Sequence, residues 1–256
     1  MHVSYNPIAR YYDVEYRSKD DDIDFYIDAA QEYGSPILEI GIGTGRMAIP
    51  LAKHGHGITG IDNSSEMLKV LKSKVEKSPG EARHNIQYLL ADMRRFSLNR
   101  QFPLCIIPFR AFLHNLSMRD QLLTLQQIHR HLERGGKLVL DIFVPIYSVI
   151  AAKKWQDTVE YHVSPRSRKS VTVTSEISHD PVQQILTIEN DYRSTLQKKS
   201  PPVARGGFAY RYIFRYEMEL LLRFVGFRLL NMYSDFDGSP YDFDSGNMVV
   251  VAEKST

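Results

Sequence analysis

The sequence predicts an α/β fold in which a seven-stranded sheet, with its last strand antiparallel, carries helices on both faces and an inserted antiparallel β-sheet. Two observations predict this fold. Apolar runs of strand length alternate with segments of helical periodicity over residues 36–144, which is typical of strands connected by helices. Segments with a period of two replace this alternation over residues 147–215, and the alternation then resumes. We therefore expect a core of residues 1–146 and 216–256 with an inserted lid subdomain of residues 147–215.

Composition and charge exclude several classes of partner. The chain is 43% hydrophobic and 24% charged with a net charge of +2, so no strong field or basic tract predicts a nucleic-acid partner. No apolar segment reaches the roughly 20 residues that span a bilayer, and no signal-peptide core opens the chain, so we expect no membrane partner. The single cysteine, Cys105, excludes an internal disulfide and fits a cytoplasmic location.

The first strand leads into a glycine-rich turn. Residues 1–35 predict a short helix and a second helix, with the acidic run Asp20–Asp22 as a solvated face and helix N-terminus in preference to a metal site. The strand over residues 36–41 then runs into Glu39-Ile40-Gly41-Ile42-Gly43-Thr44-Gly45 and the next helix. Glycines permit a close backbone approach, so a ligand can lie beside the N–H groups that open this helix. A glycine-rich turn alone is weak evidence for a ligand.

The next two strands both end in an acid. The strand over residues 57–62 ends at Asp62, about 20 residues past the glycine turn, where a βαβ unit binds a nucleotide ribose. Capping of the next helix, which Asn63–Glu66 opens, is the alternative role for Asp62. The strand over residues 86–92 places Asp92 and Met93 at the carboxyl edge of the sheet, where ligands of open α/β folds bind.

The remaining elements follow in order. A strand over residues 102–109, a helix over 119–132 ended by Gly135-Gly136, and a strand over 137–144 complete the first part of the core. The period-2 segments of the insertion are residues 158–163, 170–177, 184–192 and 209–216. A helix over 216–224 and an antiparallel hairpin of strands 227–233 and 248–252 close the chain.

The insertion is basic, and no metal site is predicted. Residues 153–215 carry 11 basic and 6 acidic side chains, 11 − 6 = +5, which favours an anionic ligand, although a solvated outer face explains this charge equally well. The acids between Asp235 and Asp244 lack the spacing of a calcium loop, and His54 and His56 lack a third ligand at a usual distance in sequence.

Together these features resemble the class I S-adenosylmethionine-dependent methyltransferases, a Rossmann-like family, over nearly the whole chain. The segments that carry the resemblance are Leu38–Gly45, similar to the family's E/D-x-G-x-G-x-G, Ile61–Ser64 with Met67-Leu68, Ala91–Met93, Leu132–Gly136 and Glu219–Phe227. Arg134 departs from the proline that the family usually has there. Tyr12–Tyr16, similar to Y-D-x-x-Y, and Pro108–His114 resemble the glycine N-methyltransferases and the nucleotide-sugar amine dimethyltransferases.

The resemblance implies S-adenosylmethionine as the cofactor. Glu39 would face the cofactor's ammonium, Asp62 would bind the ribose hydroxyls, and Asp92 would accept the adenine amino group. The complete set of cofactor-binding residues implied in this way is Tyr16, Glu39, Gly41, Gly43, Asp62, Asn63, Met67, Asp92, Met93 and Pro108.

The expected reaction moves a methyl group to a nitrogen or oxygen of a small-molecule acceptor by in-line displacement, for which the protein supplies proximity and orientation. His114 is the candidate general base if the acceptor arrives protonated, with packing as an equal alternative. Arg110 is the candidate for orienting a substrate anion, with a surface salt bridge as its alternative. For Tyr11, Tyr210 and Tyr212, core packing is favoured over a place in the acceptor pocket.

Two rival functions remain. One is a protein that binds the methyl donor or its product without turnover. The other is an NAD-dependent oxidoreductase, which the glycine spacing, the position of Asp92 and the closing hairpin disfavour. The sequence leaves the acceptor unidentified and leaves both a monomer and a homodimer open.

Overall fold

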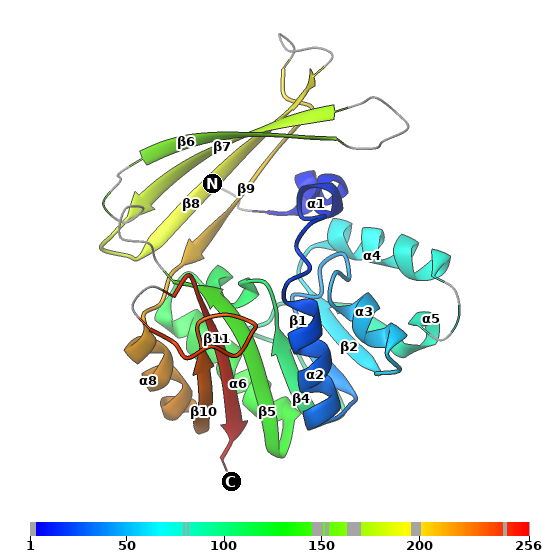
Figure 1. Ribbon diagram of the computed structural model, residues 1–256, viewed down its shortest axis with the longest axis vertical. Coiled ribbons are helices and arrows are strands. Elements are labelled where there is room, and N and C mark those ends of the chain that lie inside the picture. Colours follow the sequence, from blue (N-terminus) through cyan, green and yellow to red (C-terminus); the bar gives the residue numbers. More distant parts are fainter. Residues whose placement is uncertain are drawn as a thin grey trace.

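A computed structural model describes residues 4–78, 80, 82–144, 151, 154–162, 170–195, 201–242 and 245–255. Within them the chain forms a seven-stranded sheet with helices on both faces and a separate four-stranded antiparallel sheet (Figure 1). The strands of the large sheet are β1 (Ile37–Ile40), β2 (Ile58–Asp62), β3 (Ile86–Leu90), β4 (Phe102–Ile107), β5 (Leu132–Phe143), β10 (Phe227–Tyr233) and β11 (Asn247–Lys254). The strands of the small sheet are β6 (Lys154–His162), β7 (Ser170–Asp180), β8 (Ile185–Ser194) and β9 (Ala204–Arg211).

The order of the large sheet is β10-β11-β5-β4-β1-β2-β3. Strands β1 to β5 pair in parallel, whereas β11 runs antiparallel to both β5 and β10. The predicted fold class is therefore confirmed, including the antiparallel last strand and the closing hairpin. The strand order reverses beside β1, and in open sheets of this kind ligands bind at that switch point, beyond the carboxyl ends of the strands.

Alternating side chains of the strands divide the core between the two faces of the large sheet. The helices are α1 (Ala9–Glu15), α2 (Ile23–Tyr33), α3 (Ala48–Lys53), α4 (Ser65–Lys77), α5 (Ala82–Asn85), α6 (Met118–His131) and α8 (Arg215–Val225), with 3-10 turns η1 (Asn6–Ile8) and η2 (Ala111–His114). Buried apolar side chains of α6 and α8 share one cluster with Leu38, whereas those of α2, α3 and α4 share another with Ile37. Both faces are therefore covered, which explains why the central strands read as continuous apolar runs.

Two predicted boundaries are wrong. Helix α6 ends at His131 and β5 begins at Leu132, because Leu132 pairs with Phe102. The pairing then resumes five residues later, at Lys137 with Leu104. Residues 133–136 therefore bulge from the strand, with Gly135 at φ 74°, where glycines were expected to end the helix.

The fourth strand of the insertion also differs from its prediction, since β9 covers Ala204–Arg211. Helix α8 begins at Arg215, because the Phe214 N–H donates to the Glu217 side chain at 3.0 Å and so caps the helix there. The predicted strand over residues 158–163 belongs to β6, which begins at Lys154, and residue 163 lies outside the described residues.

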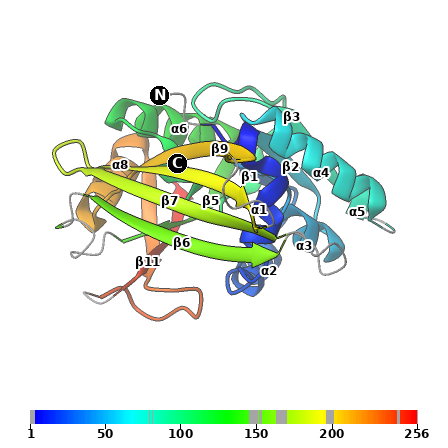
Figure 2. The ribbon, with the colours of Figure 1, turned by 90° about the horizontal axis from the view of Figure 1, so that it is seen from above.

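The N-terminal segment joins the two sheets. The Ser4 N–H donates to the Gly207 carbonyl of β9 at 3.1 Å, and the Tyr5 ring stacks on Phe208 at 5.2 Å. Figure 2 shows the small sheet from above, with its strands crossing over α1. Tyr11 of α1 stacks on Tyr192 of this sheet at 4.8 Å. No helix in the described ranges combines the length and apolarity that a bilayer crossing requires.

Candidate functional site

A cavity of about 410 Å³ lies at the carboxyl ends of the central strands. Its walls come from the glycine turn after β1, the ends of β2, β3 and β4, the turn η2, the N-terminal segment and β9. The residues that line it include Tyr5, Tyr12, Glu39, Gly41, Gly43, Arg46, Asp62, Asn63, Met67, Met93, Pro108, Phe109, His114, Leu116 and Ala209. This volume is typical of sites for small molecules and cofactors.

The glycine turn is shaped for close approach. Gly41 and Gly43 have φ values of 75° and 55°, which a residue with a side chain rarely adopts. A Cβ atom at Gly41 would lie 2.9 Å from the Ala111 side chain, whereas one at Gly43 would meet nothing closer than 3.8 Å. Gly43 therefore presents bare backbone to the cavity.

Asp62 fixes the glycine turn to the next helix. Its Oδ2 accepts a hydrogen bond from the Gly43 N–H at 2.9 Å, and its Oδ1 accepts one from the Ser64 N–H at 2.7 Å. Burial raises the pKa of this carboxyl, and the backbone hydrogen bonds oppose the rise. The cap of α4 is Ser64, whose hydroxyl accepts from the Met67 N–H at 3.2 Å, so the predicted capping signal is confirmed.

Glu39 is the most unusual group in the cavity wall. Its side chain is 2% exposed, and its Oε2 has no hydrogen-bond partner among the described residues. Burial raises the pKa of Glu39 to about 8, although the positive charge of Arg46 acts against this rise. A buried carboxylate oxygen without a partner costs free energy, so this position is suited to a positively charged group of a ligand.

Arg46 brings a positive charge to the same cavity. Its guanidinium donates two hydrogen bonds to Asp22, at 2.7 and 2.6 Å, and lies 4.8 Å from the centre of the Phe109 ring. Asp22 is the N-cap residue of α2, so the predicted helix N-terminus is confirmed, but it is fully buried, so the predicted solvated face is wrong for this residue. The pair joins the start of α2 to the turn before α3.

His114 is held as a neutral imidazole. Its Nδ1 lies 3.1 Å from the Ala209 carbonyl, which can only accept, so Nδ1 carries the proton. Nε2 then accepts a hydrogen bond from the Tyr5 hydroxyl at 3.2 Å. Burial lowers the pKa of His114 to about 4.

The turn after β4 is strained. Phe109 and Arg110 have consecutive φ values of 54° and 67°, which cost of order 1–3 kcal/mol each for residues with side chains. Buried Asp141 holds the turn, because its Oδ1 accepts from the Phe109 N–H and from the Tyr26 hydroxyl, both at 2.7 Å. The turn directs Arg110 toward the Phe143 ring, at 5.4 Å, and Arg110 does not line the cavity.

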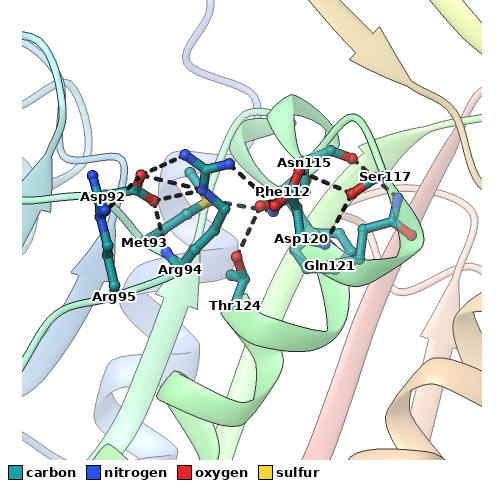
Figure 3. Close-up of polar contacts among 10 residues, drawn as sticks. All are labelled: Asp92, Met93, Arg94, Arg95, Phe112, Asn115, Ser117, Asp120, Gln121 and Thr124. Carbon is teal, nitrogen blue, oxygen red and sulfur yellow. Dashed lines mark hydrogen bonds and ion pairs between the residues drawn. The ribbon is translucent and has the colours of Figure 1, made fainter.

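Asp92 lies outside the cavity lining. It accepts hydrogen bonds from the Arg94 side chain, the shortest at 2.6 Å, and Arg94 also donates to Asp120 at 3.1 Å (Figure 3). These bonds lower the pKa of Asp92. The neighbouring Met93 does line the cavity, and its sulfur accepts from the Asn115 amide at 3.3 Å.

The structure therefore brings most of the predicted residues together. Those that line the cavity are Glu39, Gly41, Gly43, Asp62, Asn63, Met67, Met93, Pro108 and His114. Tyr16, Asp92 and Arg110 do not line it, and Tyr16 packs behind the wall on Tyr12 and Phe109 at 4.8 and 5.0 Å. Tyr11, Tyr210 and Tyr212 are buried by packing, as predicted.

Several lining residues have no counterpart in the predicted site. Tyr5 reaches the cavity from the N-terminal segment, and Ala209 and Leu116 reach it from β9 and the segment after η2. Arg46 directly follows the glycine stretch, so its position in the sequence was a usable signal. No comparable signal marks Tyr5, because His114 and Phe208, which position it at the cavity, lie more than 100 residues away in the sequence.

Comparison with known proteins finds similarity to methyltransferases. Residues 37–136 match the model of the family described as "Methyltransferase domain". Over this stretch, which is less than half of the chain, the protein is similar to methyltransferases. It is similar to the cypemycin N-terminal methyltransferase of Streptomyces sp, with 23% identity over 86% of this chain and 84% of that protein.

Solved structures share the fold over nearly the whole chain. The CcbJ methyltransferase of Streptomyces caelestis has a TM-score of 0.79 and 22% identity, covering 95% of this chain and 96% of that one. CalS10 of Micromonospora echinaspora, an amino pentose methyltransferase solved with S-adenosylmethionine bound, has a TM-score of 0.67 and 16% identity, with 95% and 96% covered. The chain therefore has the fold of these methyltransferases.

Proposed function

We propose that this enzyme moves a methyl group from S-adenosylmethionine to a nitrogen or oxygen of a small molecule bound in the cavity described above, with nitrogen favoured. The observation that carries this proposal is the buried Glu39 oxygen without a partner, in the wall of a glycine-lined cavity. A cationic ligand group satisfies this oxygen, whereas a neutral one leaves the carboxylate uncompensated.

The residues of the cavity fit the cofactor. Its amino acid end carries an ammonium and a carboxylate, and Glu39 and Arg46 offer the two opposite charges in one wall. We assign the ammonium to Glu39 and the Pro108 carbonyl, and the carboxylate to Arg46. Gly41 and Gly43 allow the backbone to lie against this end of the molecule.

The ribose and adenine are assigned to the other half of the cavity. Asp62 would bind the ribose hydroxyls with the lone pairs that its two backbone donors leave available, and Asn63 lies beside it. Met67 and Met93 would border the adenine. The assignment of Asp92 to the adenine amino group remains a prediction, since Asp92 would have to accept that bond in addition to those from Arg94.

When bound, the cofactor supplies a methyl group made electrophilic by a positively charged sulfur. The chain's own residues then orient the acceptor for in-line attack and exclude water. Tyr16, which packs behind Tyr12, would close the cavity over the methionine end of the cofactor. His114 Nε2 can take a proton from the acceptor when the Tyr5 hydroxyl turns away from it.

The acceptor side of the cavity is neutral. Tyr5, His114, Leu116 and Ala209 line it, and of the described residues in this part none is charged. We infer that the reacting group of the acceptor enters as a neutral amine or hydroxyl, and that any anionic part lies outside the cavity toward the inserted sheet. Two similar proteins are named as an N-terminal methyltransferase and an amino pentose methyltransferase, which favours nitrogen.

Replacement of Asp62 by alanine tests the cofactor site. The loss of hydrogen bonds to a charged group, worth about 1.5–3 kcal/mol, should weaken S-adenosylmethionine and S-adenosylhomocysteine binding about 10- to 100-fold. Titration calorimetry measures this, with the exposed Asp237→Ala as control and NAD as a ligand that should not bind. Undiminished affinity in Asp62→Ala would show that the assignment is wrong.

The role of His114 is tested by kcat as a function of pH. If His114 is the general base, replacing it by alanine should lower kcat about 100-fold or more. Because the pKa of His114 is lowered to about 4, the wild-type imidazole stays neutral above pH 5, so titration of His114 should not reduce kcat between pH 5 and 9. Tyr5→Phe, which keeps the stacked ring, is the matched control; full kcat in His114→Ala throughout this range would exclude a base.

A methyl-transfer screen over amines, amino acids, peptides with free N-termini and amino sugars identifies the acceptor class. Transfer of labelled methyl to any member, abolished in Glu39→Leu, supports the proposal. Tight cofactor binding with no transfer to any of these classes would favour the rival function of a binding protein without turnover.

A further inference from the structure

Helix α8 presents large apolar side chains away from the body of the protein. Tyr216, Leu220 and Phe224 follow one another at four-residue spacing, so they share one face of the helix, and they are 72%, 65% and 75% exposed. Met218 and Leu222, which belong to the other face, are fully buried. Both ribbon views show α8 at the outer edge of the molecule (Figures 1 and 2). The helix therefore already packs on the core through its buried face, and the exposed apolar stripe is a second apolar face.

The size of the stripe indicates an interaction surface. A buried aromatic side chain removes roughly 150–250 Å² from water, so the stripe offers several hundred Å² in one continuous strip. That is comparable with the largest apolar patch of a typical monomer, which is often functional. A stable dimer buries about 800 Å² per partner, so the stripe would supply about half of such an interface and its flanks the remainder.

We propose that this stripe is a homodimer interface in which α8 packs antiparallel against α8 of a second copy. The stripe is centred on Leu220, with an aromatic ring four residues before it and another four residues after it. A two-fold axis at Leu220 places Tyr216 of each copy against Phe224 of the other and brings the two leucines together. The patch is thus complementary to itself, which a two-fold interface requires.

The charges beside the stripe agree with the same arrangement. Glu219 and Arg223 lie on one flank of the helix, and the antiparallel pairing brings Arg223 of each copy to the same flank as Glu219 of the other, about 3 Å apart along the helix axis. Glu219 uses Oε1 to accept from Arg215 within its own copy, at 3.1 Å. In the part of the chain that the structure describes, Arg223 has no ion-pair partner. A second copy supplies the opposite charge that this arginine lacks.

Sedimentation velocity on the full chain tests the proposal. The wild type should sediment as a dimer at about 10–100 μM, as expected for a dissociation constant near or below 10 μM. Leu220→Glu should be monomeric, because two carboxylates would meet on the axis. Val159→Glu, at a 49% exposed valine of β6 in the other sheet, is the matched control and should remain dimeric. Circular dichroism spectra verify that both variants fold.

A charge exchange tests the pairing itself. Arg223→Glu should weaken the dimer at least tenfold, because the new carboxylate would lie beside Glu219 of the other copy on the same flank. The double variant Glu219→Arg/Arg223→Glu should restore it, because opposite charges meet again. A monomeric wild type, a dimeric Leu220→Glu, or a double variant no tighter than Arg223→Glu would each overturn the proposal. All these measurements report mass, so they stand apart from the proposed methyl transfer.

Discussion

Glu39→Gln is expected to stabilise the cofactor-free protein at pH 8 and, at the same time, to weaken its binding of S-adenosylmethionine. The reason for the first effect is that burial raises the pKa of Glu39 from 4.5 to about 8. The contribution of the neutral Glu39 carboxyl to the free energy of unfolding is fully present below about pH 4.5 and is lost as the pH rises through 8. Glutamine keeps the shape and never ionises, so it avoids this loss.

The size of the effect follows from the shift in pKa. A shift of 8 − 4.5 = 3.5 corresponds to at most about 5 kcal/mol at pH values above 8. Urea unfolding at pH 5 and pH 8 measures it: the two proteins should be alike at pH 5, and the variant should be more stable at pH 8. A wild type that is equally stable at both pH values would contradict a buried, unpaired Glu39.

The predicted effect of Glu39→Gln on cofactor binding can be measured separately, through proton release. A cationic cofactor group beside Glu39 lowers its pKa again, so binding at pH 7 should release a proton. Calorimetry in buffers of different ionisation enthalpy detects that proton in the wild type and should find none in Glu39→Gln. The variant should also bind S-adenosylmethionine at least tenfold more weakly, because a charged partner is replaced by a neutral one.

Arg46→Ala is expected to cause the largest loss of stability among single replacements in the cavity wall. Asp22 is fully buried and would lose both of its side-chain donors, which costs about 3–5 kcal/mol for a buried pair. Chemical denaturation measures this, with the exposed pair of Lys69 and Glu66 as control, where Lys69→Ala should cost less than about 1 kcal/mol.

The double variant Asp22→Asn/Arg46→Ala separates folding from binding. It should recover much of the lost stability, because no buried charge is left without a partner. It should not recover cofactor affinity, because the positive charge assigned to the cofactor carboxylate is still missing. Recovered affinity in the double variant would show that Arg46 serves the fold alone.

Local patterns were sufficient for the parts of the site that follow directly from single strands. The glycine turn and Asp62 come directly after apolar runs, and parallel strands bring their carboxyl ends to one edge, so their meeting could be predicted. Pairing between distant segments could not. The start of β5 depends on Phe102 pairing with Leu132, and the burial of Asp22 depends on Arg46. The positive φ of Phe109 depends on Asp141, 32 residues later.

The bridge between Ser4 and Gly207 has a consequence for the order of folding. The segment that matches the methyltransferase family, residues 37–136, contains the glycine turn, Asp62 and the strands that support them, and most of their partners are close in sequence. Ser4 and Tyr5, in contrast, must wait for a strand made some 200 residues later. During synthesis the pocket proposed for the methyl donor can therefore form early. The wall proposed to lie beside the acceptor is completed only when β9 has emerged and the first residues of the chain pack onto it.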